Sequence, residues 1–167
     1  DWFSHGREPV DTIDVDLPEG HEWHENPMRV PRTRQDPTRT EKDAHLPPTY
    51  VNSESHWWDS SGIYGSTPEK QRRVRSFQDG KLVVENGRLP MDVQTGTAVT
   101  GFSENWWVGL GMLHTLFTLE HNAICDALKA AHPQMGDDEL FGTAQLVNAA
   151  LIAKIHTVEW TPAIVAH

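Results

Sequence analysis

The last third of the chain has the clearest pattern of apolar and polar positions. Apolar residues recur at spacings of three, four and seven along residues 106–131, which predicts an amphipathic helix. His132-Pro133 and then Gly136 end this pattern, as expected for a helix C-terminus. The apolar positions that define the helix are Leu110, Leu113, Phe117, Ile124 and Leu128.

A second helix is predicted directly afterwards. Asp137 or Asp138 is expected to cap it, because a carboxylate there accepts backbone N–H groups and suits the helix dipole. Residues 146–153 are apolar on nearly every face. Such a helix is typical of the interior of a larger, mostly helical protein, so this segment is not expected to be buried by this chain alone.

The first part of the chain has a different character. Prolines recur through the first fifty residues without helical or strand periodicity, which predicts loop structure. Thr67 followed by Pro68 is a helix-start signal. Asp79-Gly80 and Asn86-Gly87 flank a short strand-like run and predict a small hairpin.

The two predicted helices, together with the family resemblance described below, predict a mostly α fold with long loops and at most a short β-hairpin. Residues 1–104 form the loop-rich part and residues 105–167 the two core helices, within one partial domain. The chain opens on Asp1 without methionine and stops at His167 without a helix-ending signal. We therefore expect an internal fragment whose structural partners include the missing parts of its own polypeptide.

Composition removes several classes of function. The formal net charge of −10 argues against binding to nucleic acid or to an anionic membrane surface. No stretch reaches the ~18 apolar residues of a membrane span, and no charged-then-apolar leader precedes the loops, so we expect a soluble segment. Cys125 is the only cysteine and indicates no compartment.

One loop carries oxygen ligands at a spacing of two. In extended backbone, Ser55, Asp59 and Ser61 point to the same side, and Trp57 adds its backbone carbonyl. A calcium ion takes ~6 to 8 oxygens, so this set is incomplete by itself. From the spacing alone, an ordinary polar loop remains the alternative.

Several histidines are candidate ligands or binding residues. His21 and His24 lack a third ligand at a zinc-site spacing. His114 and His121 share one face of the first helix and are either pocket residues or core histidines. His156 lies near Thr161, just before Pro162, where a disturbed helix end can present it to a carboxylate.

Three stretches together resemble the animal-type haem peroxidase superfamily, which includes cyclooxygenases and fatty-acid α-dioxygenases. The first helix with Glu120-His121-Asn122 resembles the shared core. The Trp57-Trp58 loop and residues 153–161 are closer to the α-dioxygenases and their bacterial relatives. The matching stretches are residues 49–66, 105–122 and 153–161.

The resemblance implies a calcium site and a haem. Ser55, Trp57, Asp59 and Ser61 match the family's calcium loop, and Asp1 matches the aspartate that follows the distal haem histidine. Both haem-flanking histidines are then expected outside this chain, so no catalytic residue is assigned within it. Ser103 and Trp106 occupy the positions of the peroxidases' catalytic arginine and ester-forming glutamate, so covalent haem attachment is not expected there.

The resemblance also implies a substrate site. His156 and Thr161 match α-dioxygenase residues that bind a fatty-acid carboxylate, with an arginine partner expected beyond residue 167. Neither Tyr50 nor Tyr64 fits the family's radical tyrosine. The intact protein is thus expected to be a haem oxidoreductase, a peroxidase or fatty-acid dioxygenase using hydrogen peroxide or O2. The alternative is a calcium-binding structural fragment without activity of its own.

Overall fold

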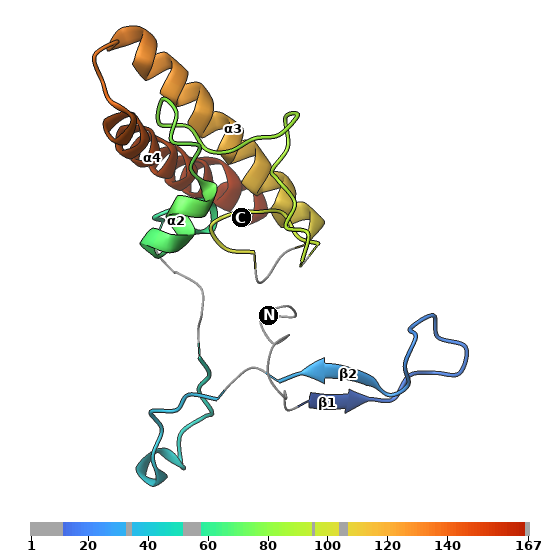
Figure 1. Ribbon diagram of the computed structural model, residues 1–167. Helices are drawn as coiled ribbons and strands as arrows, with labels where there is room; N and C mark the ends of the chain where they lie inside the picture. Colours follow the sequence, from blue (N-terminus) through green and yellow to red (C-terminus); the bar gives the residue numbers. More distant parts are fainter. Residues whose placement is uncertain (1–11, 33–34, 52–57, 95, 104–106, 166–167) are drawn as a thin grey trace. The chain divides into compact units, whose positions relative to one another are not determined.

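The computed structural model describes residues 12–32, 35–51, 58–94, 96–103 and 107–165. The chain forms two compact units, residues 1–54 and residues 55–167 (Figure 1). The predicted division after residue 104 falls inside the second unit. The first unit contains β1 (Thr12–Val15), β2 (Met28–Pro31) and the short 3-10 helix η1 (Glu41–Asp43). The second contains α1 (Ser61–Tyr64), α2 (Pro68–Val74), α3 (Val108–Ala131), α4 (Asp137–Lys154), the π-helix η2 (Ile155–Trp160) and α5 (Thr161–Ile164).

The first unit is organised by an antiparallel pair and by one arginine. β1 pairs with β2 in the register Ile13 to Val30, a pairing that the sequence analysis missed because it expected only loop there. The Arg39 guanidinium donates to the backbone carbonyls of Asp43, at 2.6 Å, and Leu46, at 3.0 Å. Its other nitrogen donates to the carbonyl of Pro47 at 2.6 Å. Arg39 therefore closes the loop around η1.

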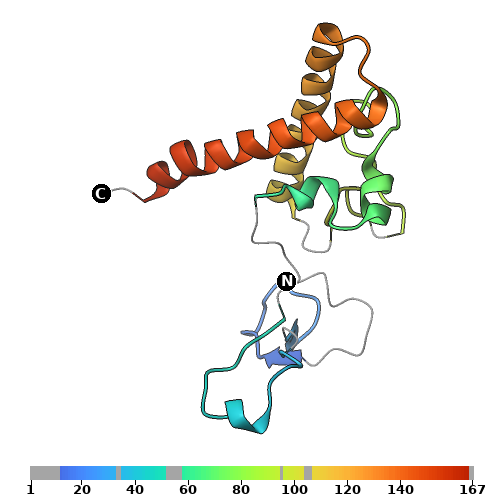
Figure 2. The same ribbon diagram turned by 90° about the vertical axis from the view of Figure 1, so that its left-hand side faces the viewer.

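The second unit is built around the α3–α4 pair, which the short turn after Ala131 connects (Figure 2). α1 contacts α2 and α3, and Val74 of α2 and Leu82 share a core with Phe141 of α4. The core between them consists of Ile63, Tyr64, Val74, Leu82 and Phe141. The expected fold class, mostly α with a short sheet, is confirmed, although the sheet lies at β1 and β2.

Local signals in the second unit were partly confirmed. Thr67 caps α2, its hydroxyl accepting the N–H of Lys70 at 3.3 Å, with Pro68 in the first turn. Asp79-Gly80 and Asn86-Gly87 are turns with positive φ. The expected hairpin reduces to isolated bridges, Arg75 with Leu82 and Glu85 with Arg88.

The predicted cap of α4 was wrong. Gly136 occupies the N-cap position, and Asp137 and Asp138 lie inside the first turn. The Asp137 carboxylate instead binds Arg75 at 2.6 Å and accepts the N–H of Gly80 at 2.6 Å. Partners distant in sequence but close in the fold thus replace the local capping bond.

Large apolar side chains remain exposed on the helices of the second unit. Leu146 on α4 is 74% exposed and Met112 on α3 is 68% exposed. This exposure agrees with the expectation that α4 is not buried by this chain alone. Over the described ranges, no helix combines the length and apolar character needed to cross a bilayer.

Candidate functional site

The end of α4 passes into a π-helix at the predicted substrate residues. The N–H of Thr161 bonds to the carbonyl of His156, which is the i to i+5 pattern of a π turn. Pro162 follows, and its ring and missing N–H are incompatible with continued α-helical bonding. A wider turn relieves this conflict. π turns often occur where a helix presents side chains at a functional site.

His156 and Thr161 are brought together by this turn. The Thr161 hydroxyl donates to the carbonyl oxygen of His156 at 2.7 Å. The hydroxyl must rotate away from this carbonyl before it can donate to a ligand. No hydrogen bond to the imidazole nitrogens of His156 is found within the described part of the chain, and the side chain is exposed.

Two indole rings contact the His156 imidazole. The Trp160 ring is stacked on it, with centroids 5.2 Å apart and planes 27° apart. The Trp58 ring lies 5.3 Å away and is tilted by 51°. Trp160 comes from the same π turn, whereas Trp58 precedes α1 and is distant in sequence.

The predicted calcium loop is described only in part. Asp1, Ser55 and Trp57 lie outside the described residues. The Asp59 Oδ1 accepts the N–H of Ser61 at 3.0 Å. Ser60, between them, has a φ of 59°, in the left-handed region. The turn thus sets the Asp59 carboxylate against the Ser61 backbone, and the calcium set itself stays a prediction.

No group of three or more His, Cys, Asp or Glu side chains in the described ranges could hold a metal ion. The proposed calcium set does not conflict with this, because it relies on hydroxyl and carbonyl oxygens with two carboxylates. Asp59 is the only one of those two carboxylates that the structure describes.

His114 and His121 are both buried, and neither fits the role of a haem ligand. The two nitrogens of His121 lie 2.9 Å from the Tyr64 hydroxyl and 2.9 Å from the Gly80 carbonyl. The His114 Nε2 lies so close to Gly62 that a Cβ there would be 3.2 Å away. Burial lowers the pKa of His114 to about 4, so its neutral form is favoured. They are core histidines.

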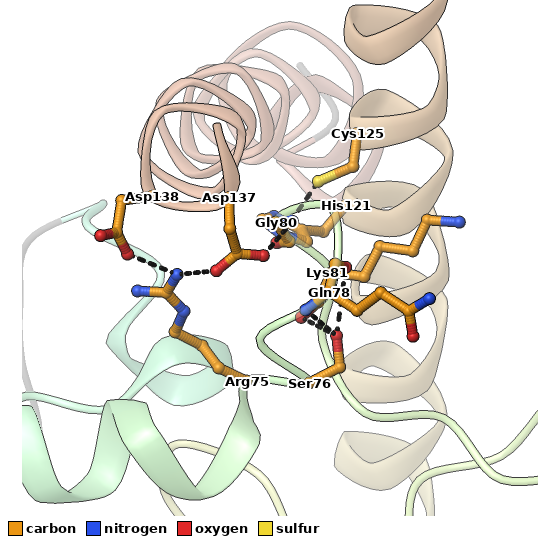
Figure 3. A network of polar contacts seen from close by, with 9 residues as sticks. All are labelled: Arg75, Ser76, Gln78, Gly80, Lys81, His121, Cys125, Asp137 and Asp138. Carbon is orange, nitrogen blue, oxygen red and sulfur yellow. Dashed lines mark hydrogen bonds and ion pairs between the residues drawn. The ribbon is translucent and has the colours of Figure 1, made fainter. Parts of the chain in front are cut away.

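Two polar networks that hold the helices together were not predicted from the sequence. In one, Arg75 binds Asp137 and Asp138, and Asp137 reaches the Gly80 turn (Figure 3). In the other, the Asn148 amide donates to the Tyr64 hydroxyl at 2.8 Å. A lone asparagine in the apolar stretch of α4 was the signal available for the second network.

The chain is similar to known proteins over most of its length. The family model for animal haem peroxidase matches residues 4–167. The chain is 36% identical to alpha-dioxygenase PIOX of Oryza sativa over 165 residues, covering 96% of this chain and 26% of that protein. It is 39% identical to alpha-dioxygenase 2 of Arabidopsis thaliana over 163 residues, with 96% and 25% covered.

A solved structure gives the same result. The crystal structure of a variant of Oryza sativa fatty acid alpha-dioxygenase with palmitic acid has a TM-score of 0.71 and 34% identity, covering 92% of this chain and 26% of that chain. The chain thus spans about a quarter of the length of the relatives that it matches. On the extent of the family match, this chain belongs to the animal haem peroxidase family.

Proposed function

We propose that the complete polypeptide is a haem-dependent oxidoreductase of the α-dioxygenase type, and that this segment binds the carboxylate of a fatty acid. The observation that supports the proposal is the π turn, in which the Thr161 hydroxyl donates to the backbone carbonyl of His156. The identity of 36% and 39% to two α-dioxygenases supports the same substrate class.

The chemistry of the two side chains suits an acidic headgroup. An imidazole N–H and a hydroxyl are donors, and hydrogen bonds to a carboxylate are stronger than those between neutral groups. The same segment exposes Val158 and Ile164, which are 60% and 57% accessible. Apolar surface next to polar donors is what an amphiphilic acid requires.

Haem would supply the oxidising chemistry in the complete protein. Its iron ligands come from residues other than His114 and His121, because both are committed to the core. This chain's own contribution is to bind and orient the acid. The Tyr64 hydroxyl is buried between His121 and Asn148, and burial raises its pKa further above the usual range, so Tyr64 serves the core.

Calcium is the second proposed cofactor. Asp59 and Ser61 would hold it with Asp1, Ser55 and the Trp57 carbonyl, in a structural role. Replacing Asp59 by Asn removes a charged ligand and should weaken calcium binding by about 10-fold or more. Equilibrium calcium titration of the complete protein measures this, with Asp14→Asn as an exposed control. Equal affinities for the two variants would contradict the site.

The substrate proposal is tested by oxygen uptake of the complete haem-loaded protein with palmitic acid. His156→Ala and Thr161→Val should each raise KM about 10- to 100-fold, because each removes a bond to a charged group. Thr157→Val is the matched control on the same turn, and its KM should stay near wild type.

Other outcomes decide between the alternatives. Peroxide-driven oxidation of a small donor without palmitate-dependent uptake would favour the peroxidase. Failure to bind haem would contradict both enzyme functions and leave the structural fragment. Uptake unaffected by His156→Ala would remove this segment from the substrate site.

A further inference from the structure

Trp58 and His156 connect two parts of the second unit that are far apart in sequence. Trp58 directly precedes Asp59 and the turn that begins α1, while His156 lies in the π-helix after α4. Their ring centroids are 5.3 Å apart. The contact joins His156, which is proposed to bind the substrate carboxylate, to a loop outside the proposed substrate site.

His156 needs such a contact. It is exposed on a π turn, and its imidazole nitrogens have no hydrogen bond to other described residues that would fix the ring. An unrestrained side chain loses rotamer freedom when it binds a ligand, which weakens affinity. A ring already held between neighbours avoids part of that loss.

Trp160 cannot fix the His156 ring relative to the rest of the unit, because both residues belong to the same turn. It is only four residues from His156 and moves with the same π-helix. Trp58 is anchored elsewhere, because Asp59 and Ser61 form the turn that leads into the buried residues Ile63 and Tyr64. Trp58 can therefore fix the imidazole relative to the core, which Trp160 cannot.

Trp58 is 56% exposed and His156 is exposed as well, so the contact between the two rings lies at the surface of the second unit.

We infer that Trp58 is a positioning residue for carboxylate recognition: it orients the His156 imidazole so that its N–H is directed to the acid headgroup. This inference rests on the proposed function. The inference predicts that replacing Trp58 weakens the binding of an acid. The binding of an uncharged molecule with the same apolar chain should not change.

The test compares two probes of equal chain length, dodecanoic acid and dodecan-1-ol, titrated anaerobically into the complete haem-loaded protein. Trp58→Leu should weaken binding of the acid about 3- to 10-fold, from the lost preorganisation of one side chain. The affinity for the alcohol should change by less than about twofold, since it carries no charged headgroup for His156 to bind. Trp58→Phe keeps a ring and should retain most of the acid preference.

Trp107→Leu is the matched control. Trp107 is 60% exposed and has no ring contact with His156 among the described residues. Its replacement removes an indole of similar exposure from the start of α3 and should leave the ratio of acid to alcohol affinity unchanged. The Soret absorbance of each variant reports whether the haem-binding fold is intact.

A double-mutant cycle separates a role through His156 from a general effect on packing. In the His156→Ala background, Trp58→Leu should cause no further loss of acid binding, because the group that it positions is gone. Additive losses, or equal losses for acid and alcohol, would overturn the inference. If His156→Ala weakens acid binding and Trp58→Leu does not, this inference fails alone. If His156→Ala has no effect, the proposed carboxylate site fails with it.

Discussion

The hydroxyl of Tyr64 lies 2.9 Å from Nδ1 of His121, and this pair fixes the protonation of the imidazole. The other nitrogen, Nε2, lies 2.9 Å from the Gly80 carbonyl, which can only accept. Nε2 therefore carries the proton and Nδ1 accepts from Tyr64. The Tyr64 oxygen in turn accepts from the Asn148 amide, so one hydroxyl joins α1, α3 and α4.

Tyr64→Phe should destabilise the second unit by about 1 to 3 kcal/mol, because His121 loses its donor and the Asn148 amide loses one acceptor in a buried site. Asn148 keeps its bond to the Phe117 carbonyl at 3.0 Å, which limits the loss. Native-state hydrogen exchange of the complete protein measures the opening free energy of α3 and α4. Tyr50→Phe, at a residue 52% exposed, should change it by less than about 0.5 kcal/mol. Equal effects of the two changes would contradict a stabilising role for the buried hydrogen bonds of Tyr64.

Acidification should destabilise the same unit through His114. Burial lowers its pKa from 6.5 to about 4 in the folded chain. Between these values the unfolded chain binds a proton that the folded chain excludes, so stability is full above pH 6.5 and falls as the pH drops towards 4. His121 adds a loss of the same sign, because burial also lowers its pKa.

The variant His114→Leu has no imidazole at this position, so no proton is taken up there on unfolding. Between pH 6.5 and pH 4 its opening free energy should fall less than that of the wild type, and the difference should be about 3 kcal/mol. Hydrogen exchange at matched pH, corrected for intrinsic exchange rates, provides the comparison. The control is His132→Leu, a change of the same kind at an exposed residue that leaves His114 in place. A slope unchanged in His114→Leu would show that His114 has the same pKa in the folded and the unfolded chain.

Features whose partners are close together in the sequence could be predicted, and features whose partners are far apart in the sequence could not. The α2 cap uses Thr67 and Lys70, and the 79–80 and 86–87 turns depend on their own residues, so local reading found them. The same local rule predicted that Asp137 caps α4, but Asp137 lies in the first turn, and its carboxylate binds Arg75, 62 residues away. β1 was missed because a four-residue strand carries too little alternation to reveal its partner.

The candidate site shows the same division. The proximity of His156 and Thr161 is a local consequence of Pro162 and was within reach of the sequence. The Trp58 contact depends on how α1 and α4 pack, and no periodicity encodes it. The calcium set rests on Asp1, Ser55 and Trp57 as well as on Asp59 and Ser61, and it stays a prediction.

Arg75 should contribute far more to stability than its neighbour Arg73. The Arg75 side chain is 9% exposed, pairs with Asp137 and Asp138, and stacks on Phe141 with its guanidinium carbon 4.2 Å from the ring centroid. Arg75→Leu should cost about 2 to 4 kcal/mol, since it leaves a partly buried carboxylate without its cation. Urea titration followed by tryptophan fluorescence measures the change.

Arg73 provides the internal comparison. It forms a 3.1 Å pair with Asp92, but its side chain is 62% exposed. Water screens such a pair, so Arg73→Leu should cost less than about 1 kcal/mol. Similar losses for the two arginines would mean that the Arg75 network adds nothing beyond a surface ion pair.

Substituting Gly80 and Gly87 by alanine distinguishes the cost of a steric clash from the cost of backbone strain. Both have positive φ, 73° and 76°. A methyl group at Gly80 would lie 2.5 Å from the Phe141 nitrogen and 2.7 Å from the Leu140 Cβ, while one at Gly87 would meet nothing within 4 Å. Gly87→Ala should therefore cost only the left-handed strain, about 1 kcal/mol. Gly80→Ala should cost about 3 kcal/mol or more, because the turn must also move away from α4 and loosen its bonds to Asp137 and His121. Melting temperatures of the two variants give the ranking, and a Gly80→Ala protein as stable as Gly87→Ala would mean that the turn does not pack against α4.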